Sequence, residues 1–293
     1  MSSKQRKQSY EASEHVQRWL REQGTEAEQG EFNPSFLIAR RDADWLLSSL
    51  AVFYQQRLIT DVVAQAASGK EATVYVCEAH PATGFALVAA KIYRPRMFRS
   101  LKNDAVYREG RQQRQDGKWA RPDRARRGRD STRGRLDEVA SWIRQEFVVQ
   151  LAMHNAGVPV PAPLAQIGNA ILMEYIGDDD GPAPRLSDTA IDPDNAAQMC
   201  DQLLDAIRLS LAHDTIHGDL SPYNVLIHDA QAYVIDYAQA VDARHGSPED
   251  AMVLLARDVD RICAFFAAYG VRRDAVAITA DLWLRYQTGG LDG

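Results

Sequence analysis

Apolar and polar positions divide the chain into a strand-rich part followed by a helix-rich part. Three strand-like runs come first, at 58–66, 73–79 and 85–93, and turn residues separate them at 68–71 and 80–84. Short runs that are rich in β-branched residues and bounded by Gly, Pro and Ser are typical of strands. These runs predict an antiparallel meander, and shorter strand-like runs follow at 164–167, 170–176, 225–228 and 233–236.

Helical periodicity predicts five helices. They are expected at 42–54, 136–155, 194–212, 248–269 and 272–287. Leu136, Val139, Ile143, Phe147 and Leu151, for example, recur at the spacing of one helical face. The helix at 194–212 has Asp192 and Asp194 as candidates for its cap.

The order of these elements predicts an α+β chain in two lobes. We expect a mobile N-terminal tail at 1–30 and a helical extension at 31–57. A sheet-rich lobe is predicted at 58–177, with a long mobile loop at 94–135, and a mainly helical lobe at 178–293. The polar stretch 178–182 is interpreted as the linker between the two lobes.

Charge is unevenly distributed along the chain. The net charge is −6, but residues 108–135 hold 11 Lys and Arg against 4 Asp and Glu, a local charge of +7. This pattern favours an anionic partner such as RNA or a ribosomal particle, and the alternative is a solvated, disordered loop. Three widely spaced cysteines and the lack of a long apolar run predict a cytoplasmic protein with no zinc site, disulfide or membrane partner.

The candidate chemistry begins in the segment 217–224, His-Gly-Asp-Leu-Ser-Pro-Tyr-Asn. Asp219 and Asn224 stand five residues apart, and Asp236 follows an apolar run twelve residues later. Phosphoryl transfer needs a carboxylate to orient or deprotonate the acceptor and hard oxygen ligands for Mg²⁺. The spacing predicts Asp219 as the base and Asn224 and Asp236 as metal ligands. A single Asp in such a place is more often a structural cap than a catalytic group.

Two further features fit the same chemistry. Lys91 ends the third predicted strand, where a lysine pairs with phosphates, and Glu146 lies on the next predicted helix as its partner. The small-residue turn at 68–72 offers backbone N–H groups to phosphates, although it is neither G-x-x-x-x-G-K-[ST] nor G-x-G-x-x-G. Taken alone, a strand-end lysine is usually solvated and such a hairpin is usually only a turn.

Together these motifs resemble the RIO family of atypical serine kinases, in particular a bacterial-type member of its Rio-one-like branch. The resemblance covers about residues 58–270 and is carried by motifs in the same order and at the same spacing. These are ASGKEA at 67–72, KIYR at 91–94, WIRQEFVVQLAMHNAGVPVP at 142–161, MEYIG at 173–177, HGDLSPYN at 217–224, IDYAQAV at 235–241 and RDV at 257–259.

The resemblance implies a trimmed bilobal kinase-like fold that uses ATP and Mg²⁺. Adenine would be bound at Glu174 and Ile176, and phosphates at Ser68, Lys70 and Lys91. The implied nucleotide-binding residues are Ser68, Gly69, Lys70, Glu71, Lys91, Glu146, Met173, Glu174, Ile176, Asn224 and Asp236. The implied catalytic residues are Asp219, Asp236 and Lys91.

The resemblance also implies transfer of the γ-phosphate to serine, either by autophosphorylation or on a protein acceptor. Ser131 and Thr132 are candidate acceptors within the chain. ATPase chemistry through a phosphorylated aspartate, here Asp236, is a further implication. Family members in other domains of life act in maturation of the small ribosomal subunit.

Departures from kinase patterns leave two alternatives open. Ala67 and Pro222 replace a serine and a glutamate of the family motifs, Gly218 replaces the arginine of H-R-D, and Ser221 stands where Ser/Thr kinases have a lysine. The first alternative is a small-molecule phosphotransferase of the aminoglycoside or choline type, which also uses HGDL. The second is an ATP-gated RNA- or ribosome-binding module, whose binding would weaken steeply with salt.

Overall fold

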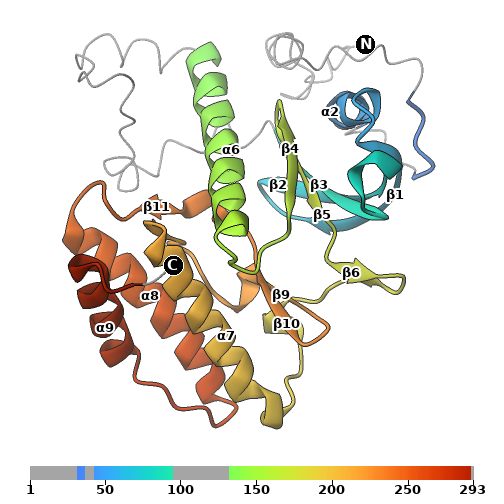
Figure 1. The fold of residues 1–293 in the computed structure, drawn as a ribbon. Helices are drawn as coiled ribbons and strands as arrows, with labels where there is room; N and C mark the ends of the chain where they lie inside the picture. The colour runs from blue at the N-terminus through green and yellow to red at the C-terminus, as the bar shows by residue number, and fades with distance from the viewer. Residues whose placement is uncertain (1–31, 37–42, 95–131, 292–293) are drawn as a thin grey trace, which may run out of the picture. The chain divides into compact units, whose positions relative to one another are not determined.

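The computed structural model describes residues 32–36, 43–94 and 132–291 (Figure 1). The chain divides into two compact units. Among the described residues, the first unit holds 32–36, 43–94, 132–144 and 164–175, and the second holds 145–163 and 176–291. The expected tail at 1–30 and nearly all of the basic loop lie outside the described residues.

The first unit is built on an antiparallel five-stranded sheet in the order β1-β2-β3-β5-β4. Its strands are β1 (Ile59–Ser68), β2 (Ala72–Ala79), β3 (Leu87–Tyr93), β4 (Pro163–Ile167) and β5 (Ala170–Glu174). The predicted meander at 58–93 is confirmed. The short helical turn η3 (Pro81–Thr83) joins β2 to β3 and is capped by the His80 ring, which accepts a hydrogen bond from the Ala82 N–H.

Helix α2 (Ala43–Gln55) packs against this sheet. Leu50 and Phe53 are fully buried, in line with a helix that has a dense apolar face. A buried polar link ties α2 to the sheet: Ser49 donates to the Asn169 side chain at 2.9 Å, and the Asn169 amide donates to the Tyr93 carbonyl at 2.9 Å. Both ends of the Asn169 amide are therefore satisfied, as burial requires.

Helix α6 (Thr132–Asn155) contributes its first half to the first unit and its second half to the second. It begins four residues before the predicted start at 136, so residues 132–135, assigned to the loop, are helical. The helix ends at Asn155, and Gly157, two residues later, adopts a left-handed backbone with φ of 80°.

The core of the second unit lies among three packed helices, α7 (Pro193–Ala212), α8 (Pro248–Ala267) and α9 (Ala275–Thr288). Asp192 caps α7 as predicted, by accepting from the Asp194 N–H at 3.1 Å, and Pro193 occupies the first helical position. Within this part of the chain no described helix has the length and apolarity of a membrane span.

Short strands complete the second unit, and several differ from the predictions. They are β6 (Gly177–Asp178), β7 (Gly181–Pro182), β8 (Thr215–Ile216), β9 (Val225–His228), β10 (Gln231–Val234) and β11 (Val241–Asp242). The stretch 178–182, interpreted as a linker, is a tight hairpin of β6 and β7. The strands predicted to reach 176 and 236 end earlier, at Glu174 and Val234.

Candidate active site

The loop 217–224 follows β8 and ends in the short helix η7 (Pro222–Asn224), and one buried carboxylate holds its backbone. Asp258, on α8, is 1% exposed and accepts hydrogen bonds from the N–H groups of Gly218 at 2.7 Å and Leu220 at 3.0 Å. Burial raises the pKa of Asp258, against the opposing effects of His217 and these two amides. The two amides flank Asp219, so Asp258 fixes the backbone on both sides of the predicted base.

Gly218 is required by the path of this loop. Its φ is +76°, a conformation that costs other residues energy, and an added Cβ would lie 2.7 Å from the carbonyl oxygen of Gln239. The neighbouring atom belongs to backbone and cannot move aside cheaply. Any residue with a Cβ, including the arginine of H-R-D, would therefore clash at position 218 of this chain.

Asp219 is about half exposed, and a guanidinium from α8 contacts its carboxylate. Arg261 donates from Nη1 to Oδ1 of Asp219 at 2.8 Å. Arg257, one turn earlier on α8, donates to the carbonyl of Gly218. Two arginines and one aspartate of the same helix thus set the position and the electrostatics of the loop.

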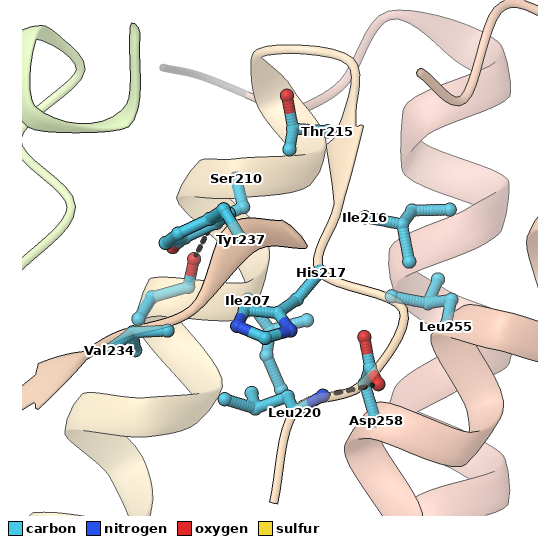
Figure 2. A pocket seen from close by; sticks show the side chains of 11 residues that line it. Ile207, Ser210, Thr215, Ile216, His217, Leu220, Val234, Tyr237, Leu255 and Asp258 are labelled. Carbon is cyan, nitrogen blue, oxygen red and sulfur yellow. Dashed lines mark hydrogen bonds between the residues drawn. The ribbon is translucent and has the colours of Figure 1, made fainter. Parts of the chain in front are cut away.

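A small pocket behind the loop is lined by His217, Tyr237, Ser210 and Asp258 among others (Figure 2). In Figure 2 the His217 ring lies between Tyr237 and Asp258, and its centroid is 4.7 Å from that of Tyr237. Its Nε2 lies 3.1 Å from the carbonyl oxygen of Ile235. Burial raises the pKa of Tyr237, partly offset by a hydrogen bond with Ser210. Most of the other residues that line this pocket are apolar, so His217 and Asp258 lie at the edge of the hydrophobic core.

The predicted metal ligands Asn224 and Asp236 are brought together by the β9–β10 hairpin. Val225 pairs with Val234, and the Ile235 N–H donates to the Asn224 carbonyl at 3.0 Å. Asn224 Nδ2 donates to the carbonyl of Asp219 at 2.9 Å, which leaves the side-chain oxygen of Asn224 as its ligand atom. Asp236 has a left-handed backbone, with φ of 69°, immediately after the strand.

This donor set fits magnesium. An amide oxygen and a carboxylate are hard oxygen ligands, and Mg²⁺ in phosphotransferases completes its shell with phosphate oxygens and water. Among the described residues no group of three or more His, Cys, Asp and Glu side chains could hold a metal by itself. Two side-chain ligands would leave most of an octahedral Mg²⁺ shell to other oxygens.

In the first unit, the predicted phosphate turn, residues 67–72, connects β1 to β2. Ser68 pairs with Thr73, and the Gly69 N–H donates to the Ala72 carbonyl at 2.9 Å, so the turn uses this amide for its own closure. Lys70 is exposed at the tip. Arg94, just after β3, donates to the Ser68 hydroxyl at 2.7 Å.

Lys91 lies on the central strand β3, opposite Val74 of β2 and Ile171 of β5. Its Nζ is 5.1 Å from the centroid of the Tyr93 ring. Glu146, its predicted partner, is 2% exposed on α6 and belongs to the second unit. The pairing of Lys91 with Glu146 stays a prediction.

The predicted adenine segment follows β5. Met173 and Glu174 are the last two residues of that strand and pair with Ala89 and Val88 of β3. Ile176 is buried, and its carbonyl accepts from the Ala183 N–H at 3.0 Å. The second unit thus uses Ile176 in its own backbone network.

Three residues of these sites were absent from the predicted set: Asp258, Arg261 and Arg94. Asp258 did carry a signal, because it lies among the apolar positions Leu255, Val259 and Ile262 of a helix face. A carboxylate on such a face is rarely buried without a partner. Arg261 carried no comparable signal.

The sheet unit and the helical unit define an α+β fold of the protein-kinase-like class. A model of the RIO domain matches residues 74–278, and the chain belongs to this family. This membership agrees with the resemblance carried by the motifs and favours it over the aminoglycoside or choline phosphotransferases.

Curated relatives carry the same assignment. The RIO-type serine/threonine-protein kinase Rio1 of Thermoplasma acidophilum is 40% identical over 140 residues, which cover 48% of this chain and 71% of the relative. The Rio1 of Haloferax volcanii is 35% identical over 46% of this chain and 45% of the relative. RIO1 of Chaetomium thermophilum is 28% identical over 230 residues, which cover 74% of this chain and 41% of the relative. The chain thus spans less than half of the latter two.

Solved structures show the same fold. The Rio2 kinase–ADP/Mg²⁺–phosphoaspartate complex from Chaetomium thermophilum aligns with a TM-score of 0.61 at 22% identity and covers 87% of this chain and 69% of that one. Another crystal structure of that Rio2 kinase aligns with a TM-score of 0.56 at 19% identity. The alignment covers 91% of this chain and 76% of that one.

Proposed function

We propose that this chain is an ATP- and Mg²⁺-dependent kinase of the RIO type that transfers the γ-phosphate to a serine hydroxyl, on itself or on a protein acceptor. The observation that carries the proposal is the arrangement around the loop 217–224. Helix α8 holds Asp219, Asn224 donates to the Asp219 carbonyl, and the β9–β10 hairpin joins the backbones next to Asn224 and Asp236. The kinases named among the relatives support it.

In this proposal the first unit binds the nucleotide. Ser68, Lys70 and Lys91 contact phosphates, and Glu174 and the backbone after it bind adenine. Phosphoryl transfer depends on positioning and on charge compensation, since the protein supplies little covalent chemistry. Lysine cations and a hydroxyl donor serve both needs.

The second unit supplies the groups that act at the γ-phosphate. Asn224 and Asp236 hold magnesium, which compensates phosphate charge when bound. Asp219 orients the acceptor hydroxyl and accepts its proton. Arg261 donates to Oδ1 of Asp219 at 2.8 Å, and the proposal assigns Oδ2 to the acceptor hydroxyl.

Incubation with γ-labelled ATP and Mg²⁺ tests this function. The chain should incorporate label on serine, and Asp219→Asn should abolish incorporation while leaving ATP binding intact. Asp201→Asn is the matched control, because Asp201 is an exposed carboxylate of α7 that is also paired with an arginine. Equal labelling of the Asp219→Asn variant and the unmodified chain would contradict the proposal.

A second candidate is an ATPase switch that passes through a phosphorylated aspartate. The specific observation in its favour is the phosphoaspartate in the Chaetomium Rio2 structure, together with the exposed position of Asp236 in this chain. Release of labelled phosphate without stable serine labelling would favour this candidate. Hydroxylamine-sensitive label that is lost in Asp236→Asn would identify the aspartate.

The basic segment 108–135 is proposed to bind an anionic partner. Residues 108–131 and the candidate acceptor Ser131 lie outside the described residues, and Thr132 is the first residue of α6. An RNA or ribosomal partner is proposed on the local charge of the sequence alone. Filter binding of the chain to RNA over a salt series tests it, with a steep loss of affinity expected.

A further inference from the structure

Arg94 is placed beside the phosphate turn by the register of the sheet. Ala72 pairs with Tyr93 in β2 and β3, so the residue after Tyr93 lies next to the turn. The Arg94 N–H donates to the Glu71 carbonyl at 2.7 Å, which fixes its backbone there. The position of Arg94 thus follows from the strand pairing.

The guanidinium of Arg94 bridges the two hydroxyls that flank the turn. Nη2 donates to Oγ of Ser68 at 2.7 Å and to Oγ1 of Thr73 at 2.9 Å, and Nε lies 3.2 Å from the same Thr73 oxygen. Thr73 is 3% exposed, whereas Ser68 is exposed. The buried Thr73 hydroxyl therefore anchors the guanidinium, and the exposed Ser68 hydroxyl accepts a charge-assisted hydrogen bond from it.

The chemistry of these groups determines the direction of each hydrogen bond. A guanidinium has donors and no acceptor, so the Ser68 oxygen accepts and retains its own hydrogen for donation. A hydrogen bond received from a cation also polarises the hydroxyl and strengthens it as a donor. Phosphate oxygens are acceptors, and they need donors of this kind.

We propose that Arg94 is a positioning residue that directs the Ser68 hydroxyl toward a phosphate of ATP. This inference rests on the proposed function, in which the turn 67–72 binds phosphates. Arg94 acts through Ser68, and Thr73 holds Arg94 in place. Arg94 belongs to the motif KIYR at 91–94, but neither Arg94 nor Thr73 is among the nucleotide-binding or catalytic residues that the resemblance implies.

ATP and adenosine should respond differently to the loss of Arg94, because only ATP carries phosphates. A group that acts on phosphates affects the binding of ATP and leaves the binding of adenosine unchanged. A merely structural group would weaken both ligands together, because the whole nucleotide site would be disturbed. Adenosine is therefore the internal control for the fold of the site.

Isothermal titration of the full chain with Mg²⁺–ATP and with adenosine tests the proposal. Variants Arg94→Met, Ser68→Ala and the double variant are compared with Arg273→Met, which removes an exposed arginine paired with Asp201 on the second unit. We expect Arg94→Met to weaken ATP binding about tenfold, as for the loss of a charge-assisted hydrogen bond. Adenosine binding should not change, and the double variant should bind ATP no more weakly than Arg94→Met alone.

Thr73→Val gives an independent check, because it keeps Ser68 and the charge of Arg94 but removes the anchor. Its loss of ATP affinity should be smaller than that of Arg94→Met, again with adenosine unaffected.

Three results would overturn the inference while leaving the proposed function in place. They are an unchanged ATP affinity in Arg94→Met, an equal loss of adenosine affinity, and effects of Arg94→Met and Ser68→Ala that multiply in the double variant. Failure of the unmodified chain to bind ATP would instead overturn the proposed function, and the inference with it.

Discussion

At the scale of single residues, Arg261 illustrates how the chain compensates for a missing group. Ser221 occupies the position at which Ser/Thr kinases have a lysine close to the base, and Arg261 brings a cation to Asp219 from a helix some forty residues later. The guanidinium restrains the carboxylate in one orientation. Its contribution should therefore appear in turnover and not in nucleotide affinity.

Replacement of Arg261 tests this directly. Arg261→Met should lower kcat for label transfer about tenfold through loss of orientation, with the affinity for ATP unchanged. Arg261→Lys should recover part of the loss, since a lysine supplies the charge without the planar geometry. Steady-state kinetics with measured ATP affinities separate the two quantities, and a purely affinity-based defect would refute the assignment.

Gly218 offers a second prediction at this scale. Gly218→Ala introduces a Cβ 2.7 Å from the Gln239 carbonyl oxygen, whereas Gly157→Ala meets nothing within 4 Å although its φ is also positive, at +80°. Gly157→Ala should cost about 1–2 kcal/mol from backbone strain alone. Gly218→Ala should cost about 1–3 kcal/mol more, because of the clash. Urea unfolding followed by circular dichroism measures both, and equal losses would show that the loop relaxes.

At the scale of elements, α8 controls the loop 217–224 through Asp258. Asp258→Ala leaves two amides without their acceptor, and we expect a loss of about 3 kcal/mol in the free energy of unfolding. Asp250→Ala, in the exposed first turn of the same helix, should cost less than about 1 kcal/mol. Urea unfolding of both variants provides the comparison, and a loss in Asp258→Ala no larger than in the control would contradict this role.

Strand β11 ends at Asp242, a carboxylate that should give the fold a pH dependence. Partial burial of Asp242 opposes ionisation, but hydrogen bonds from Arg244 and His245 lower the pKa of Asp242 to about 2. Because this value lies below the ordinary 3.8, the ionised carboxylate stabilises the fold fully above about pH 4 and loses its contribution as the pH falls through about 2.

Asp242→Asn removes this contribution. The free energy of unfolding of the variant should therefore fall less steeply between pH 4 and pH 2 than that of the unmodified chain. Urea titrations at a series of pH values measure the two slopes. Identical slopes would assign the acid sensitivity to other carboxylates.

At the scale of the whole molecule, the sequence predicted the long elements well and the short ones poorly. Helical and alternating patterns need several residues to be seen, and the runs at 58–93 and 194–212 supply them. β6, β7, β8 and β11 have two residues each, too few to carry a periodicity. The stretch 178–182, which belongs to the β6–β7 hairpin, was consequently interpreted as a linker.

In the candidate site, too, some features could be predicted from the sequence and others could not. Asp219, Asn224 and Asp236 could be predicted because their spacing is a property of the chain. The contacts of Asp258 with Gly218 and of Arg94 with Ser68 join residues 40 and 26 positions apart. Such contacts depend on how elements pack, and residue spacing does not reveal them.

The three cysteines give a prediction for the molecule as a whole. Cys77, Cys200 and Cys263 are free and buried, and burial raises the pKa of the Cys200 thiol to about 11. The thiolate is the reactive form, so the native protein should react with Ellman's reagent far more slowly than the unfolded protein. Unfolding in urea should release three equivalents, and rapid reaction of the native protein would show that a described unit opens readily.

The buried carboxylate beneath the loop 217–224 also bears on protein engineering. The shape of this octapeptide is stored partly in α8, because Asp258 and Arg257 hold its backbone. The motif alone therefore does not determine its conformation. Copied into another protein without a helix that places an aspartate and an arginine at the positions of Asp258 and Arg257, the same eight residues would lose this backbone conformation. A transplant would have to carry both segments, and chimaeras exchanged between family members should be cut outside residues 217–261.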